Sequence, residues 1–181
     1  MTEPAQKKGR SKQDYGTPAE FLAAIERRFG KIGFDLAARA DNAVVLDFYS
    51  PEQDSLKQDW TLPGVQVAFL NPPFADIRPW AEKCESVRNL PRWTLMLVPA
   101  SMGSRWWAAH VLDKCQADGI TRITFVGETI GYPKDLALCC YGFGVKGQGF
   151  WPWKPPRVRK PRAKKGALIL APDNTRPAAT P

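Results

Sequence analysis

The sequence is poor in the residues on which metal centres and hydrolytic triads depend. It has a single histidine, His110, and four cysteines that form no Cys-x-x-Cys pair. A histidine-based metal site or catalytic triad is therefore poorly supported, and we expect no metal. His110 lies within an apolar pattern and is interpreted as structural. Adjacent cysteines could pair with each other only under strain, so we expect reduced, buried thiols at Cys84, Cys115, Cys139 and Cys140.

Long apolar segments are also missing. The chain has no run of about 18 apolar residues and no basic leader with a cleavable apolar stretch. We therefore expect a soluble, cytoplasmic protein. The 181 residues, 44% of them hydrophobic, suit one globular domain that buries its core without disulfides or metal.

Positive charge is concentrated at the two ends of the chain. Residues 15–150 have a net charge of −1, whereas residues 1–14 contribute +2 and residues 151–181 contribute +7. We predict a flexible segment over 1–14, a folded domain over 15–150 and a basic, proline-rich, disordered tail over 151–181. Such a tail suits DNA, because Lys and Arg clusters release counterions from nucleic acid. A tail that only aids solubility is the alternative. Trp151 and Trp153 would either stack on nucleic acid or anchor the tail to the core.

The pattern of apolar residues predicts an α/β fold. A first helix is indicated by Thr17 as N-cap, Pro18 at the first helical position and Gly30 as the stop. Several later runs are almost continuously apolar, which is typical of strands buried on both faces. The expected strands are 31–38, 43–50, 65–71, 94–100, 120–127 and 137–144, and the expected later helices are 77–87 and 104–117. We predict a mostly parallel sheet flanked by helices, and we favour a hairpin over a base-contacting loop for residues 127–150.

Polar residues follow several of the predicted strands. In open sheets of this kind, ligands bind beyond the carboxyl ends of the strands. Each polar residue could be explained alone by a turn or a cap, but together they indicate a pocket. The residues are Asp35, Asp47, Asp54, Asn71 and Ser101.

The segment "NPPF" ends the third predicted strand and has a chemistry of its own. Asn71 has a side-chain carbonyl acceptor, and Pro72 and Pro73 form a stiff ledge whose carbonyls also accept. A planar amine could donate one hydrogen to Asn71 and one to the Pro72 carbonyl, while Phe74 stacks on its ring. Two acceptors hold such an amine during methyl transfer from a sulfonium donor without a strong base. The alternative is a simple turn with Phe74 in the core.

An ordered set of motifs surrounds this segment. They are "YGTP", "FDLAA", "DSL" followed by Trp, "NPPF" with a downstream Trp, and "LVPASMGSRWW". "NPPF" resembles the amino-methyltransferase signature [DNS]-P-P-[YFW], and the set resembles the compact phage-type DNA N6-adenine methyltransferases, the Dam-like family. The resemblance implies S-adenosylmethionine as donor, a Rossmann-like methyltransferase sheet, adenine in DNA as acceptor, and the cytoplasm of a bacterial or phage-infected cell.

The resemblance also implies site residues. Asn71, Pro72 and Phe74 match the catalytic motif. The residues that match donor-binding segments are Tyr15, Thr17, Pro18, Asp35, Leu36, Ala37 and Asp54, the last of which could face either the donor or the base. No glycine-rich loop follows the first strand, so the backbone must approach the donor differently from that of larger methyltransferases.

Two other functions fit the same residues. A protein glutamine presents the same two amide hydrogens to the "NPPF" motif, although the basic tail argues against a protein substrate. The missing glycine loop suggests the other alternative, a catalytically degenerate nucleic-acid-binding protein that no longer binds the donor.

Overall fold

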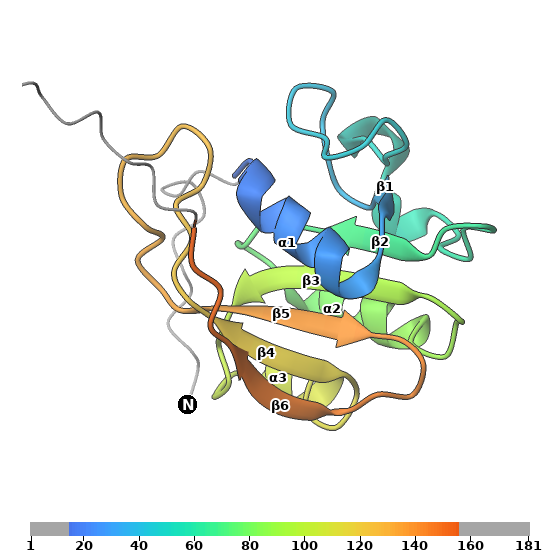
Figure 1. Ribbon diagram of the computed structural model, residues 1–181. Coiled ribbons are helices and arrows are strands. Elements are labelled where there is room, and N and C mark those ends of the chain that lie inside the picture. Colours follow the sequence, from blue (N-terminus) through green and yellow to red (C-terminus); the bar gives the residue numbers. More distant parts are fainter. Residues whose placement is uncertain (1–14, 156–181) are drawn as a thin grey trace, which may run out of the picture.

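A six-stranded sheet forms the centre of the protein in the computed structural model, which describes residues 15–155 (Figure 1). The order across the sheet is β1-β2-β3-β5-β4-β6. The strands are β1 (Ile32–Asp35), β2 (Val67–Leu70), β3 (Trp93–Pro99), β4 (Gln116–Ile120), β5 (Leu136–Tyr141) and β6 (Gly147–Trp151). The helices are α1 (Ala19–Phe29), α2 (Arg78–Ser86) and α3 (Arg105–His110), with short 3-10 helices η1 (Pro51–Gln53) and η2 (Ser55–Lys57). The predicted flexible segment 1–14 and residues 156–181 of the predicted tail lie outside the described residues.

The sheet is mixed, with one strand reversed. β1, β2 and β3 are parallel neighbours. β5 is antiparallel to both β3 and β4, and β6 is parallel to β4. β5 therefore runs against the other five strands. The predicted α/β class, with helices flanking a sheet, is confirmed, and the predicted parallel pairing applies to only part of the sheet.

Helices cover both faces of the sheet. α1 lies on one face, and α2 and α3 lie on the other (Figure 1). Alternate residues of β2 serve the two sides, because Val67 and Phe69 pack in the α1 layer while Ala68 and Leu70 pack in the opposite layer. All four residues of β2 and all six of β5 are buried. The continuous apolar runs correctly predicted strands buried on both faces.

The first helix starts one residue away from the predicted position. α1 buries Phe21, Ala24 and Ile25, and it ends at Gly30, whose positive φ of 103° suits glycine. Its N-cap is Pro18, and no side chain caps it. The prediction that Thr17 is the N-cap is wrong, and the Thr17 hydroxyl is hydrogen-bonded to Asn71 instead.

Two predicted strands differ from the structure. Residues 43–50 form only an isolated parallel bridge between Asp35 and Phe48. This segment lies at the edge beyond β1, and Leu46 is 97% exposed, so the packing that a buried strand needs is absent there. The strand predicted at 120–127 lies too far along the chain, because the strand in this region is β4, which covers Gln116–Ile120. The helix predicted over 104–117 is shorter than expected and ends at His110. The polar residues of β4 obscured its pattern.

The predicted hairpin over 127–150 is wrong. β6 pairs with β4 rather than with β5, so the chain crosses to the other side of β4 after β5 ends. Gly149 faces the Asp118 side chain, and a Cβ at position 149 would lie 2.7 Å from Asp118 Oδ1. Any larger residue at position 149 would have to displace the Asp118 carboxylate, so glycine is favoured there.

Interactions outside the site join the layers. Arg28 of α1 forms an ion pair with the buried Asp118 of β4 at 2.5 Å. Trp153 is 9% exposed, and its ring centroid lies 5.0 Å from that of Phe21, so this residue anchors the chain after β6 to the core. His110 Nδ1 lies 2.8 Å from Glu85 Oε2, which links α3 to α2 and supports the structural interpretation.

The predicted state of the cysteines is confirmed. All four are free and buried. Burial raises the pKa of the Cys84, Cys139 and Cys140 thiols well above the usual value. Between residues 15 and 155 there is no group of three or more His, Cys, Asp or Glu side chains that could hold a metal ion, and no helix there could cross a membrane.

Candidate active site

A cavity of about 230 Å³ opens at the carboxyl ends of β1 and β2. The loops that follow these strands and the segment before α1 form its walls. Six of the predicted site residues line it, namely Tyr15, Thr17, Asp35, Ala37, Asp54 and Asn71. Because adjacent parallel strands end at the same edge of a sheet, segments distant in sequence meet at this point.

Four predicted site residues lie beside the cavity without lining it. Pro18 is the N-cap of α1. Leu36 is fully buried, and its N–H donates to the Phe69 carbonyl at 2.8 Å. Pro72 is buried, and Phe74 packs among other aromatic rings. Their proposed contacts with donor or base stay predictions.

Asn71 is held by the segment that precedes α1. Its Nδ2 lies 2.6 Å from the Tyr15 carbonyl oxygen and 3.3 Å from Thr17 Oγ1. A carbonyl oxygen can only accept, so the side-chain atom facing Tyr15 must be the amide nitrogen. Within residues 15–155, no group donates to Asn71 Oδ1. The arrangement leaves the carbonyl end of this amide available as an acceptor.

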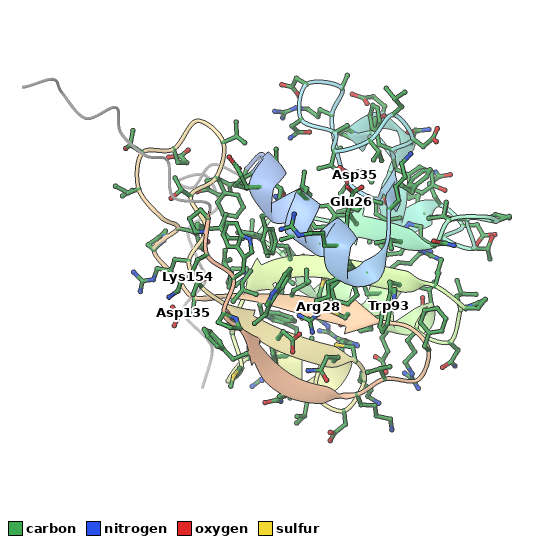
Figure 2. The ribbon with its side chains drawn as sticks, in the orientation of Figure 1. Glu26, Arg28, Asp35, Trp93, Asp135 and Lys154 are labelled. Atoms are coloured by element: carbon green, nitrogen blue, oxygen red, sulfur yellow. The ribbon has the colours of Figure 1, made fainter. Side chains whose placement is uncertain are left out.

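Asp35 is held by the loop that follows it. Its Oδ1 accepts from the Ala37 amide at 3.2 Å, and its Oδ2 accepts from the Val44 amide at 3.1 Å. The Asp35 backbone also forms hydrogen bonds with the backbone of Asp47 and Tyr49, which hold the far side of the same loop in place. Asp35 is 3% exposed where β1 ends (Figure 2), and burial raises the pKa of its carboxyl above the usual value. Its side chain therefore shapes this wall of the cavity.

The "DSL" segment forms the opposite wall. Asp54 connects η1 and η2 in the left-handed region, with φ of 50°, and its carboxylate pairs with Lys57 at 2.8 Å. Next to it, Ser55 is 4% exposed and lines the cavity, yet its Oγ has no hydrogen-bond partner within the described residues. An orphaned hydroxyl at a cavity wall fits a polar ligand. Ser55 was not among the predicted site residues, although it is adjacent to one.

Aromatic residues cluster around Phe74. The Phe74 ring centroid lies 6.0 Å from that of Tyr15, 6.3 Å from that of Phe125 and 5.5 Å from that of Tyr132. Tyr15 stacks on Phe125 at 4.8 Å. Sequence reasoning missed Phe125 and Tyr132, because they follow β4 in a segment that was predicted as a strand and a hairpin. Their aromatic character and spacing were the only available signals.

The donor implied by the sequence resemblance fits the residues that are present. The cavity combines the carboxylates of Asp35 and Asp54, the orphaned Ser55 hydroxyl and the aromatic side chains of Tyr49 and Trp80. Such a mixture suits an apolar ring system joined to hydroxyl and amino groups. Trp80 is also the downstream Trp of the "NPPF" pattern, and it was not assigned a role from the sequence.

A cavity at the carboxyl ends of parallel strands, lined by apolar and aromatic side chains with a few polar groups, is typical of the sites where α/β proteins bind nucleotide-like ligands. The particular family follows from comparison with known proteins. Residues 5–140 match the family described as DNA N-6-adenine-methyltransferase (Dam), and the chain belongs to this family.

One curated relative is similar over part of the chain. It is the DNA N-6-adenine-methyltransferase of Escherichia phage T1, which is 32% identical over 93 residues. This match covers 51% of the present chain and 38% of the relative, so the similarity spans less than half of the phage protein. No solved structure matches the chain.

Proposed function

We propose that this protein transfers a methyl group from S-adenosylmethionine to the exocyclic N6 amine of adenine in DNA. The observation on which the proposal depends is the Asn71 amide, whose nitrogen donates to Tyr15 and Thr17 and whose oxygen accepts from no residue between 15 and 155. Membership in the Dam family supports both the donor and the substrate class, and it favours DNA over a protein glutamine.

On the donor side, residues of the loops after β1 and β2 would hold S-adenosylmethionine. The donor supplies a methyl group activated by a sulfonium centre. Asp54 offers a carboxylate for hydroxyl or ammonium groups, and Ser55 offers a hydroxyl that has no partner within residues 15–155. Asp35, whose carboxylate oxygens accept from its own loop, would shape the wall against which the donor lies. Tyr49 and Trp80 provide apolar walls. Thr17 and Ala37 complete the set implied by the resemblance, which also includes Tyr15, Pro18 and Leu36.

On the acceptor side, Asn71 Oδ1 and the Pro72 carbonyl would each accept one hydrogen of the adenine amine. These two acceptors orient the amine as its nitrogen forms a bond to the methyl carbon and the carbon–sulfur bond breaks. One proton of the resulting cationic amine then passes to water. Phe74 would provide a stacking face for the extruded base. Tyr132 contacts the Phe74 ring, so it would border the same base.

The arrangement of the chain supports a Rossmann-like methyltransferase domain over residues 15–150. Five strands run in one direction, and the cavity lies at the carboxyl ends of two of them. The basic segment 151–181, with a net charge of +7, would contact the DNA backbone.

The proposal is tested by incubating the full chain with S-adenosylmethionine and mixed-sequence duplex DNA, then measuring N6-methyladenine by mass spectrometry of the digested DNA. We expect methyl incorporation by the wild type and a strong loss in Asn71→Ala. Donor binding without incorporation, or incorporation that Asn71→Ala leaves undiminished, would reject the assignment. Methylation of protein glutamine in place of DNA would favour the alternative substrate.

The role of the basic tail needs a separate measurement. Deletion of residues 154–181 retains Trp153, which is buried against Phe21. We expect weaker DNA binding and a flatter dependence of the binding constant on salt, with donor binding retained. A full-length variant with the Lys and Arg residues of the tail replaced by Gln is the control for charge. An unchanged salt slope would assign the tail another role.

A further inference from the structure

We infer that the segment Tyr15–Thr17 fixes the orientation of the Asn71 side-chain amide, with Thr17 acting as a positioning residue. The inference rests on the proposed function, because it concerns how the acceptor oxygen is presented to the adenine amine. The resemblance implies donor binding for these residues, and the geometry adds a different role.

An asparagine side chain can rotate by half a turn and exchange its nitrogen for its oxygen with little change in shape. Only the oxygen can accept a hydrogen from the adenine amine. A flipped Asn71 would present an N–H group to the N–H of the amine, and no hydrogen bond could form between the two groups. The Pro72 carbonyl would then be the single acceptor left from the two proposed. The reaction therefore requires a restraint that distinguishes the two ends of the amide.

The Tyr15 carbonyl provides this restraint. It lies 2.6 Å from Asn71 Nδ2, and in the flipped amide two acceptor oxygens would face each other at that distance. Thr17 Oγ1, at 3.3 Å, provides a second acceptor for the same amino group. The amide nitrogen thus faces two protein acceptors, and Oδ1, to which no described residue donates, is the end that remains for the substrate.

The restraining segment is itself held in place. Gly16 forms an isolated antiparallel bridge with Val126, and the Val126 N–H donates to the Gly16 carbonyl at 2.9 Å. The Tyr15 ring stacks on Phe125. Thr17 is 8% exposed and is not used as the N-cap of α1, so its hydroxyl is free to face Asn71.

A consequence concerns aspartate, which the general signature [DNS]-P-P-[YFW] permits at this position. In Asn71→Asp, a carboxylate oxygen would replace the nitrogen that faces the Tyr15 carbonyl at 2.6 Å. No hydrogen would then bridge these two oxygens. We therefore expect aspartate to fail in this chain even though it provides an acceptor.

The experiment compares Thr17→Val, Thr17→Ser and Asn71→Asp with the wild type at saturating donor. Thr17→Val keeps the shape but removes the acceptor, and we expect kcat to fall about fivefold, the effect of one lost hydrogen bond. Thr17→Ser should restore most of the rate. Asn71→Asp should lower kcat by about 100-fold or more. Thr61→Val is the matched control, because within residues 15–155 that hydroxyl is hydrogen-bonded only to Asp59, and Thr61 does not line the cavity.

A readout independent of activity follows the Asn71 side-chain NH₂ group by ¹⁵N NMR, with the resonances assigned from their disappearance in Asn71→Ala. We expect slow hydrogen exchange in the wild type and in Thr17→Ser, and faster exchange in Thr17→Val. Equal rates in the valine and serine variants, equal exchange in all variants, or a fully active Asn71→Asp would overturn the inference. A change in donor affinity alone, with kcat unchanged, would assign Thr17 to donor binding instead. A wild type that fails to methylate DNA would reject the proposed function, whereas the exchange measurement would still decide the role of Thr17.

Discussion

Asn71 and Asp35 end neighbouring parallel strands and line the same cavity, but the protein holds their side chains in different ways. Both carboxylate oxygens of Asp35 accept hydrogen bonds from backbone amides of its own loop, those of Ala37 and Val44. Among the described residues Asn71 is bound only through its nitrogen, and its partners lie more than 50 residues away, in the segment before α1.

Asp35 therefore maintains the shape of the cavity, whereas Asn71 offers a hydrogen-bond acceptor to a ligand inside it. Removing the Asp35 carboxylate would deprive two partly buried loop amides of their acceptor. Removing the Asn71 amide would take away an acceptor that no described residue uses, together with the hydrogen bonds from Nδ2 to Tyr15 and Thr17. Tyr15 and Thr17 line the cavity, where water can replace the lost donor. We therefore expect the first change to affect mainly stability and the second to affect mainly catalysis.

The largest expected effect is that of Asn71→Ala on methyl transfer. We expect kcat/KM to fall by roughly 100-fold or more, because one of the two acceptors for the amine is lost. The melting temperature should change little by comparison. Steady-state kinetics and calorimetry on the same preparation would test both expectations. If Asn71→Ala lowered the melting temperature and lost activity only to the extent that it unfolds, Asn71 would have the same structural role as Asp35.

The next effect is that of Asp35→Ala on stability. Loss of both acceptors should lower the free energy of unfolding by roughly 1–3 kcal/mol, since two partly buried amides lose their partners. Asp35→Asn keeps one acceptor and should fall between this variant and the wild type. Urea unfolding followed by circular dichroism would measure the three values. Equal stabilities would show that water replaces the carboxylate.

A smaller effect concerns pH. Burial raises the folded-state pKa of Asp35 above its ordinary value of 3.8. The folded protein therefore holds this proton at pH values where the unfolded chain has released it. The contribution of Asp35 to stability is largest below 3.8 and declines as the pH rises through the folded-state pKa.

This dependence can be measured as the difference in free energy of unfolding between the wild type and Asp35→Asn, from about pH 3 to pH 7. We expect the advantage of the wild type to shrink as the pH increases. An advantage that grows with pH would mean that the two amide hydrogen bonds outweigh burial and depress the pKa.

The smallest effect is expected at the exposed edge of the cavity. Lys57 pairs with Asp54, but its side chain is 81% exposed, and solvent screens such a pair. Lys57→Ala should leave the melting temperature unchanged within experimental error. A clear loss of donor binding in this variant would show that the pair positions Asp54 for the ligand.

Sequence reasoning predicted which polar residues meet at one cavity better than it predicted the elements around them. Asn71 and Asp35 were expected to meet because each follows an uninterrupted apolar run, and parallel strands end together. β4 was not predicted correctly, because the partner of its buried Asp118 is Arg28, 90 residues earlier in the chain. Tertiary interactions of this kind determine whether a polar residue can be buried in a strand.

The orientation of the Asn71 side-chain amide likewise could not be predicted from a sequence pattern. "YGTP" and "NPPF" were both recognised, but nothing in their spacing indicated that the first supplies hydrogen-bond acceptors to the second. Thr17 was expected to cap α1, a local role, and the structure shows a long-range contact in its place. The preference of threonine for capping a helix is overridden when another polar group close in space forms a hydrogen bond with the same hydroxyl.

The reversed strand β5 has a consequence for how the chain folds. β3 and β4 have no direct pairing with each other, and β5, which is synthesised after both, lies between them. On the ribosome, the inner edges of β3 and β4 must therefore stay open until residues 136–141 have emerged. Open apolar edges are templates for aggregation. The sheet is thus joined into one only after β5 has been synthesised, and a chain stopped before β5 is expected to need a chaperone.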